Sequence, residues 1–170
     1  MNNEFKSILA GGIVRSLIRL LRGKDKLWEN SRFVLAEVPL NPGELKKILP
    51  CGLMPVAEAT GILFIVNYTK PSFTIPYKEA ALLIKVRTLL GKGVHCCWMV
   101  VDDDTALIYG RELLGYPKKM AEISFEEKGN HIHASVTRRG IKILEMQGER
   151  GPVQNPAPVI FDRKTFNIGG

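Results

Sequence analysis

From residue 61 onward the sequence is a series of short apolar runs separated by turn-forming residues, and this pattern limits the fold more than any other feature. Runs rich in β-branched and aromatic residues predict strands at 62–68, 77–86, 95–101, 106–109, 122–125, 131–136 and 141–144. Glycine, proline and charged residues interrupt them, including the run Asp102-Asp103-Asp104, which we interpret as a solvated turn. Many short strands without intervening helices favour a mainly β (α+β) domain built on an antiparallel sheet or barrel.

The first sixty residues add two helices and one strand to this prediction. Residues 8–22 carry apolar side chains at close to helical spacing, with arginines mainly between them, and so predict a basic amphipathic helix. We expect its apolar face to pack on the body of the protein or on another subunit; the alternative is contact with a membrane surface. A strand is predicted at 32–38, and a short helix at 43–49 that ends before Pro50. We therefore expect an N-terminal segment, 1–27, followed by a β domain, 28–170.

Composition argues against several other classes of protein. A chain of 170 residues with 45% hydrophobic and 24% charged residues is typical of one globular domain. No stretch approaches the roughly 20 apolar residues of a membrane span, and no signal-peptide pattern is found, so we predict a cytoplasmic protein. The three cysteines contain no CxxC pair and predict no zinc site. Of the net charge of +7, +4 lies in residues 1–32 without a nucleic-acid-binding motif, so we expect no nucleic-acid partner.

The most unusual local sequence is segment 109–119, Tyr-Gly-Arg-Glu-Leu-Leu-Gly-Tyr-Pro-Lys-Lys. Its two glycines and its proline restrict the backbone, and Pro117 pushes Tyr116 toward extended geometry, so Lys118 follows a rigid turn. A lysine held against apolar neighbours loses hydration, which favours the neutral amine, and the neutral amine is the form that attacks ketones. The alternative is a surface turn with two solvated lysines.

This segment resembles the signature of the acetoacetate decarboxylase family, Gly-Arg-Glu-Leu-x-x-Tyr-Pro-Lys-Lys, in which the first lysine forms a Schiff base. Residues 75–79, Ile-Pro-Tyr-Lys-Glu, resemble the family's Tyr-x-Glu strand. The resemblance implies that Lys118 is the Schiff-base lysine and Glu79 the active-site carboxylate. It also implies a cone-like β-barrel of the acetoacetate decarboxylase-like type. The resemblance is strongest over about residues 75–120.

The resemblance implies a reaction as well. Lys118 would condense with the ketone of a β-keto acid such as acetoacetate, and the iminium would draw the electrons of the C–C bond as CO₂ leaves. No metal or organic cofactor is implied, because the iminium is itself the electron sink. Glu79 would position the substrate or carry a proton. Lys119 is the neighbouring cation that would activate Lys118, but adjacent residues of a strand point to opposite faces, so we expect burial of Lys118 to matter more.

Three further residues form the predicted substrate-binding surface. Tyr116 lies within the signature, and Phe64 occupies the position of the family's second active-site glutamate. Arg32 is adjacent to Ser31, which aligns with the family arginine thought to contact the substrate carboxylate. The resemblance further implies that the domain 28–170 is incomplete at its C-terminus, because family members continue beyond this point.

These differences from the family pattern leave two alternatives to the decarboxylase open. One is a Schiff-base enzyme of the aldolase or dehydratase type that acts on another oxo acid. The other is a non-catalytic member of the family that serves binding or assembly. For an enzyme we expect a small β-keto or 2-oxo acid as the ligand, and in every case a homo-oligomer.

Overall fold

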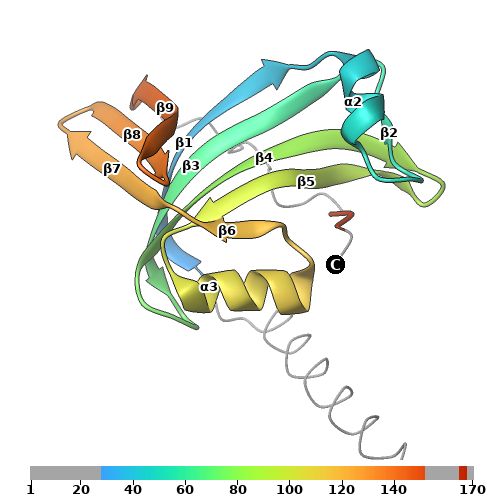
Figure 1. The fold of residues 1–170 in the computed structure, drawn as a ribbon. Coiled ribbons are helices and arrows are strands. Elements are labelled where there is room, and N and C mark those ends of the chain that lie inside the picture. Colours follow the sequence, from blue (N-terminus) through green and yellow to red (C-terminus); the bar gives the residue numbers. More distant parts are fainter. Residues whose placement is uncertain (1–27, 152–164, 168–170) are drawn as a thin grey trace, which may run out of the picture.

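The computed structural model describes residues 28–151 and 165–167 (Figure 1). The helix predicted at 8–22 and the segment 1–27 lie outside the described residues. The helices are α2 (Pro42–Ile48), α3 (Asp104–Ile108) and the π-helical turn η1 (Tyr109–Leu113). The strands are β1 (Trp28–Pro39), β2 (Met54–Pro55), β3 (Thr60–Pro71), β4 (Tyr77–Thr88), β5 (Gly91–Val101), β6 (Lys118–Met120), β7 (Glu122–Lys128), β8 (His131–Arg138) and β9 (Ile141–Glu149).

The strands form two sheets. The larger sheet has the order β1-β3-β4-β5-β6, with β2 beside β4, and the smaller sheet has the order β7-β8-β9. Figure 1 shows β1, β3, β4 and β5 as one curved layer, with β7 to β9 at one end and α3 next to β6. Every pair is antiparallel except β5 and β6, which are parallel. The mainly β prediction is confirmed, but within the described part of the chain the strands do not close into a barrel.

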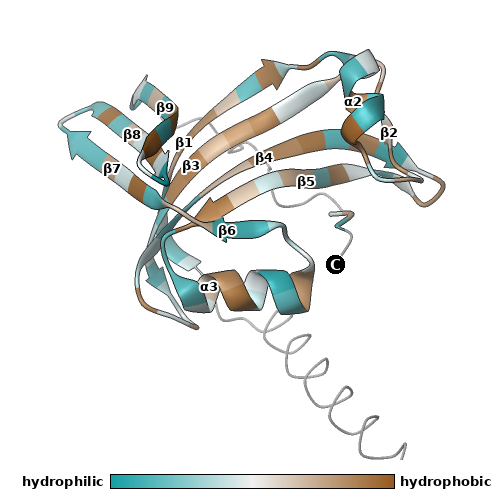
Figure 2. Cartoon of the chain, viewed as in Figure 1, coloured by the Kyte–Doolittle hydropathy of each residue, from teal (hydrophilic) through white to brown (hydrophobic). Residues whose placement is uncertain are grey.

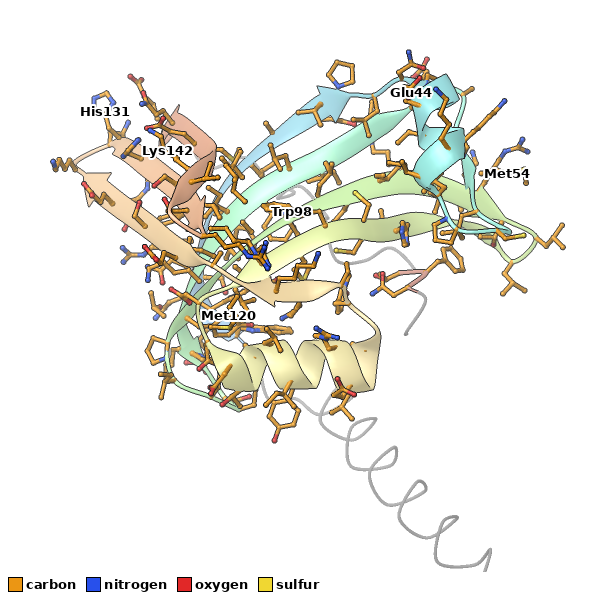
Figure 3. All side chains as sticks on the ribbon, viewed as in Figure 1. Glu44, Met54, Trp98, Met120, His131 and Lys142 are labelled. Atoms are coloured by element: carbon orange, nitrogen blue, oxygen red, sulfur yellow. The ribbon has the colours of Figure 1, made fainter. Side chains whose placement is uncertain are left out.

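The central strands β3, β4 and β5 of the larger sheet are covered by apolar side chains on both faces, so they are hydrophobic along most of their length (Figure 2). On one face, Phe64 and Tyr68 of β3 pack with Tyr77 of β4, and Ala106 of α3 covers them. On the other face, the smaller sheet covers one end, where Trp98 (labelled in Figure 3) is packed, and α2 covers the other end. The two faces therefore have separate cores, and the predicted site residues divide between them.

A β-bulge in β5 changes which of its side chains reach the α3 face. Trp98 pairs with Leu82, but Cys96 pairs with Leu83, so Cys97 is the extra residue. Cys96 consequently lies in the core cluster under α3, whereas Cys97 packs against the cluster at α2. The bulge brings Cys96 to the same side of the sheet as Glu79.

The strand predicted at 106–109 is wrong, because these residues are helical. The side chain of Asp103 caps α3 by accepting a hydrogen bond from the Ala106 N–H at 2.7 Å, and Thr74 donates to the same carboxylate at 3.0 Å. Asp102 accepts hydrogen bonds from the backbone N–H and the Nζ of Lys78 at 2.6 and 3.0 Å. The aspartate run is thus a helix cap and an anchor to β4 rather than the predicted solvated turn; only Asp104 is exposed to solvent, and it is the first residue of α3.

The short helix and the other predicted strands are present, and most of these strands are longer than predicted; β2 and β6 were not predicted. Helix α2 begins after Asn41, whose side chain accepts hydrogen bonds from the N–H groups of Gly43 and Glu44. Pro42 at the first helical position needs no N–H partner there. None of the helices in the described ranges is long and apolar enough to cross a bilayer.

Candidate active site

A buried ion pair between Lys118 and Glu79 lies at the centre of the α3 face. Lys118 is the first residue of β6 and is 6% exposed, while Glu79 lies near the start of β4 and is 5% exposed. The Nζ of Lys118 donates to Glu79 Oε2 at 2.6 Å and to the Ala106 carbonyl at 3.2 Å. A proton held between an amine and a carboxylate at this distance can pass from one to the other, so the pair is suited to general acid–base chemistry.

Gly110 makes room for the lysine side chain. It is buried in η1, and a Cβ placed on it would stand 2.4 Å from Cε, 2.5 Å from Cδ and 2.9 Å from Nζ of Lys118. Any other residue at this position would collide with the lysine stem. The π-helical turn brings its backbone against Lys118 at this point, and π-helical turns are frequent at functional sites.

The turn between η1 and β6 is tied to the helix by its backbone. Gly115 adopts a φ of 66°, which favours glycine, and its N–H donates to the Arg111 carbonyl at 3.2 Å. The N–H of Tyr116 donates to the Gly110 carbonyl at 3.0 Å, and the N–H of Lys118 donates to the Tyr116 carbonyl at 2.8 Å. The rigid turn predicted before Lys118 is present, and three backbone hydrogen bonds tie it to η1 and to the start of β6.

Aromatic rings surround the ion pair. The Tyr77 ring centroid lies 5.9 Å from Lys118 Nζ, and the Tyr77 hydroxyl accepts a hydrogen bond from Trp28 Nε1 at 3.0 Å. Burial, and then the nearby Glu79 charge, raise the pKa of Tyr68 and of Tyr77 well above its ordinary value.

Cys96 and Tyr116, two further neighbours of the ion pair, are also held in their neutral forms. Burial and then Glu79 raise the pKa of the Cys96 thiol. Burial raises the pKa of Tyr116 as well, although hydrogen bonds from the side chains of Thr165 and Asn167 act in the opposite direction. The Cys96 thiol and the Tyr116 phenol, like the phenols of Tyr68 and Tyr77, therefore stay protonated at neutral pH, so the Lys118–Glu79 ion pair lies beside uncharged thiol and phenol groups.

The structure brings four of the six predicted site residues to one face. Lys118, Glu79 and Tyr116 adjoin one another, and Phe64, 1% exposed, packs in the same cluster through its pairing with Ala81 on β4.

The other two predicted residues lie elsewhere. Lys119 is exposed, and as the next residue of the strand it points away from Lys118, as expected from strand geometry. Arg32 pairs with Glu127 of the smaller sheet, and its neighbour Val34, on the same face of β1, belongs to the cluster beneath that sheet. Arg32 is thus on the opposite face from Lys118, because it alternates with Phe33, which packs in the α3 cluster.

Three groups of site residues were missed by sequence reasoning. Gly110 could have been identified from the sequence, since it is one of the two glycines of the signature segment. Tyr77 is the tyrosine of the Tyr-x-Glu match, but its hydrogen-bond partner Trp28 is 49 residues away in the chain. Thr165 and Asn167 carried no local signal, because their contacts with the site depend on the tertiary structure.

A metal centre has no support among the described residues, where no group of three or more histidine, cysteine or acidic side chains lies close together. His131 and His133 each contact a glutamate on β9, Glu149 at 3.4 Å and Glu145 at 2.7 Å. These histidines are on the smaller sheet, away from the ion pair.

The comparisons with known proteins agree with this geometry. The model of the family described as acetoacetate decarboxylase (ADC) matches residues 19–168. The chain belongs to the acetoacetate decarboxylase family. The acetoacetate decarboxylase of Legionella pneumophila has a similar fold, with a TM-score of 0.65 at 20% identity over 71% of this chain. The enduracididine biosynthesis enzyme MppR has a TM-score of 0.66 at 16% identity over 81% of this chain. A curated relative in Lactiplantibacillus plantarum, a CLA biosynthesis isomerase, is 27% identical over 118 residues, or 66% of this chain.

The relatives found are longer than this chain. The match spans 42% of the isomerase, 48% of the Legionella decarboxylase and 59% of MppR. The chain thus spans about half the length of these relatives.

Proposed function

We propose that this protein is a Schiff-base-forming lyase in which Lys118 attacks the carbonyl carbon of a small oxo acid. The observation that carries the proposal is the buried Lys118–Glu79 pair, 2.6 Å apart, with the lysine stem passing over Gly110. A surface turn with two solvated lysines would have neither the burial nor the carboxylate. Membership of the acetoacetate decarboxylase family supports the same chemistry.

The preferred reaction is decarboxylation of a β-keto acid such as acetoacetate. Glu79 takes a proton from Lys118, and the free amine adds to the ketone; loss of water then leaves a protonated imine. The bond between the α-carbon and the carboxylate breaks, its electron pair moves toward the iminium nitrogen, and CO₂ departs. Protonation of the resulting enamine carbon and hydrolysis release the ketone and restore the amine. Glu79 lies within reach of the nitrogen to return the proton.

Borohydride trapping tests this proposal. The protein is incubated with acetoacetate and sodium borohydride, and the reduced adduct is located by peptide mass spectrometry. We expect one adduct at Lys118 that is absent in Lys118→Ala and retained in Lys119→Ala, together with release of ¹³CO₂ from labelled acetoacetate. Adducts spread over the exposed lysines, at rates equal to those of free lysine, would contradict the proposal and favour a non-catalytic member of the family.

In a second candidate function, Lys118 forms the same imine, but the imine goes on to a reaction other than decarboxylation. Arg32, the cation expected to hold the substrate carboxylate, lies on the opposite face, and Phe64 places an apolar ring in the position of the expected glutamate. These placements favour an aldolase- or dehydratase-type enzyme acting on another oxo acid. A structure of MppR is described as a complex with pyruvate, and another as a complex with a condensation product of pyruvate.

Deuterium exchange separates the two candidates. A lysine that forms an enamine from pyruvate exchanges the methyl hydrogens of pyruvate with D₂O, and proton NMR follows this exchange without any loss of CO₂. Exchange with pyruvate and no ¹³CO₂ from acetoacetate would select the second candidate.

The homo-oligomer stays a prediction, which sedimentation of the purified chain tests.

A further inference from the structure

We propose that residues 165–167, called the strap below, are part of the amine site and position the turn that carries Lys118. The catalytic consequence of this inference rests on the proposed function, but its structural part does not. The strap lies far from the signature segment in sequence, and nothing in its own composition marks it as functional.

The strap is anchored on β5. Thr165 forms a parallel bridge with Val94, and the Phe166 N–H donates to the Val94 carbonyl at 2.8 Å. The Phe166 carbonyl accepts a hydrogen bond from His95 Nδ1 at 2.8 Å, and the Phe166 ring packs against the cluster of Ile84. Because β4 occupies the other edge of β5, the strap and β6 share the remaining edge, the strap at Val94 and β6 at 99–101.

From this anchor the strap reaches the turn before Lys118. The Nδ2 of Asn167 donates to the Leu114 carbonyl at 3.3 Å, while its Oδ1 accepts from the Cys96 N–H at 3.4 Å. The side chains of Thr165 and Asn167 also hydrogen-bond the Tyr116 hydroxyl. Asn167 therefore links the backbone of β5, at Cys96, to two points of the turn: the carbonyl of Leu114 and the hydroxyl of Tyr116.

The turn is consequently held from two sides. Gly110 and Arg111 hold its backbone on the helix side, and the strap holds Leu114 and the Tyr116 hydroxyl on the sheet side. The position of Lys118 depends on that of Tyr116, since the Lys118 N–H donates to the Tyr116 carbonyl. A shift of Tyr116 would move Lys118 relative to Glu79, so Asn167 is a positioning residue that acts through Tyr116.

The alternative is that the strap only covers an open edge of β5. Its anchoring by Phe166 and Val94 would serve that role equally well. The contacts of Asn167 separate the two roles, because they reach beyond β5 to the turn. Substitution of Asn167 therefore tests positioning while leaving the Phe166 anchor in place.

The test compares Asn167→Leu, which removes both the donor and the acceptor, with Val136→Ala, which removes core volume in the smaller sheet away from the turn. The first readout is amide hydrogen exchange at Tyr116 and Lys118. We expect exchange to rise about tenfold in Asn167→Leu, as when one hydrogen bond is lost from an opening equilibrium. Val136→Ala is expected to leave these two amides unchanged under conditions where they exchange by local opening.

The second readout is the rate of adduct formation at Lys118. At saturating ketone we expect Asn167→Leu to lower this rate by on the order of 10- to 100-fold, with a smaller change in the concentration that gives half the maximal rate. Val136→Ala is expected to keep the wild-type rate at temperatures where it is fully folded.

Unchanged exchange at Tyr116 and Lys118 in Asn167→Leu would overturn the inference, as would equal increases in the two variants. Faster exchange restricted to Asn167→Leu supports it. If exchange rises in that way but the wild-type protein forms no adduct with any ketone, the strap holds the turn and the proposed function fails.

Discussion

Replacement of Gly110 by alanine separates folding from chemistry more cleanly than replacement of Lys118 itself. The added methyl group would stand 2.4 Å from Lys118 Cε and 2.5 Å from Cδ, where ordinary contacts are 3.4–4 Å. The lysine stem must therefore move by about 1 Å. Because the colliding atoms belong to a flexible side chain, the backbone can stay in place and the protein is expected to fold.

Two opposing effects set the stability of Gly110→Ala. Overpacking of a well-filled site costs about 1–3 kcal/mol, while alanine is favoured over glycine in a helical turn by about 1 kcal/mol. We therefore expect the free energy of unfolding to fall by less than about 2 kcal/mol. The reaction is far more sensitive, because a misplacement of about 1 Å lowers a rate by about 100-fold.

The assay is the rate of borohydride-trapped adduct at Lys118, measured beside urea unfolding. Gly148→Ala is the matched control, since a Cβ at Gly148 would lie 3.6 Å from Val34 Cγ2, an ordinary contact. We expect Gly148→Ala to react at the wild-type rate and Gly110→Ala to react about 100-fold more slowly. Equal rates in Gly110→Ala and wild type would refute the reasoning, because they would mean that the position of the amine does not limit the reaction.

Three other predictions concern the same face of the sheet and its surroundings. Glu79→Gln and Lys118→Met should each lower the free energy of unfolding by about 3–5 kcal/mol, since each leaves a buried charge unpaired. The double variant should lose much less than the sum of the two, and additive losses in urea unfolding would argue against a buried pair. Arg32→Ala and Lys119→Gln should change the free energy of unfolding by no more than about 1 kcal/mol and leave trapping at Lys118 unchanged, because both side chains are exposed; a large loss of adduct in either would return that residue to the site. The urea midpoint should fall as the pH rises above the ordinary cysteine and tyrosine pKa values of 9.0 and 10.0, because the unfolded chain then releases protons that the buried thiol and phenols keep; a midpoint that stays flat up to pH 11 would contradict the burial of these groups.

The sequence predicted the long strands well, because β3, β4 and β5 are buried on both faces and so read as continuous apolar runs. It predicted Lys118 and Glu79 through the resemblance of two short segments, which the sheet brings together across 39 residues. The rigid turn before Lys118 followed from Gly115 and Pro117, whose backbone preferences act locally.

Other parts of the structure depend on partners distant in sequence. Residues 106–109 are apolar enough for a strand, and the cap that makes them helical, Asp103, was interpreted as part of a solvated turn. The strand position of Arg32 does not reveal its face, because a shift of one residue exchanges the two faces of a strand. The role of Asn167 depends on β5, since its contact with Cys96 spans 71 residues.

The strap also sets an order in which the site can form. The hairpin between β4 and β5 joins neighbouring segments, whereas the contact between Phe166 and His95 closes a loop 71 residues long. Closing so long a loop costs more chain entropy, so such contacts form late in folding. During synthesis, the sheet and the Lys118–Glu79 pair can assemble while residues 165–167 are still in the ribosome. We expect the amine to reach its final position only after residues 165–167 have emerged, so a product of translation that stops before residue 165 would carry the signature lysine on a loosely held turn.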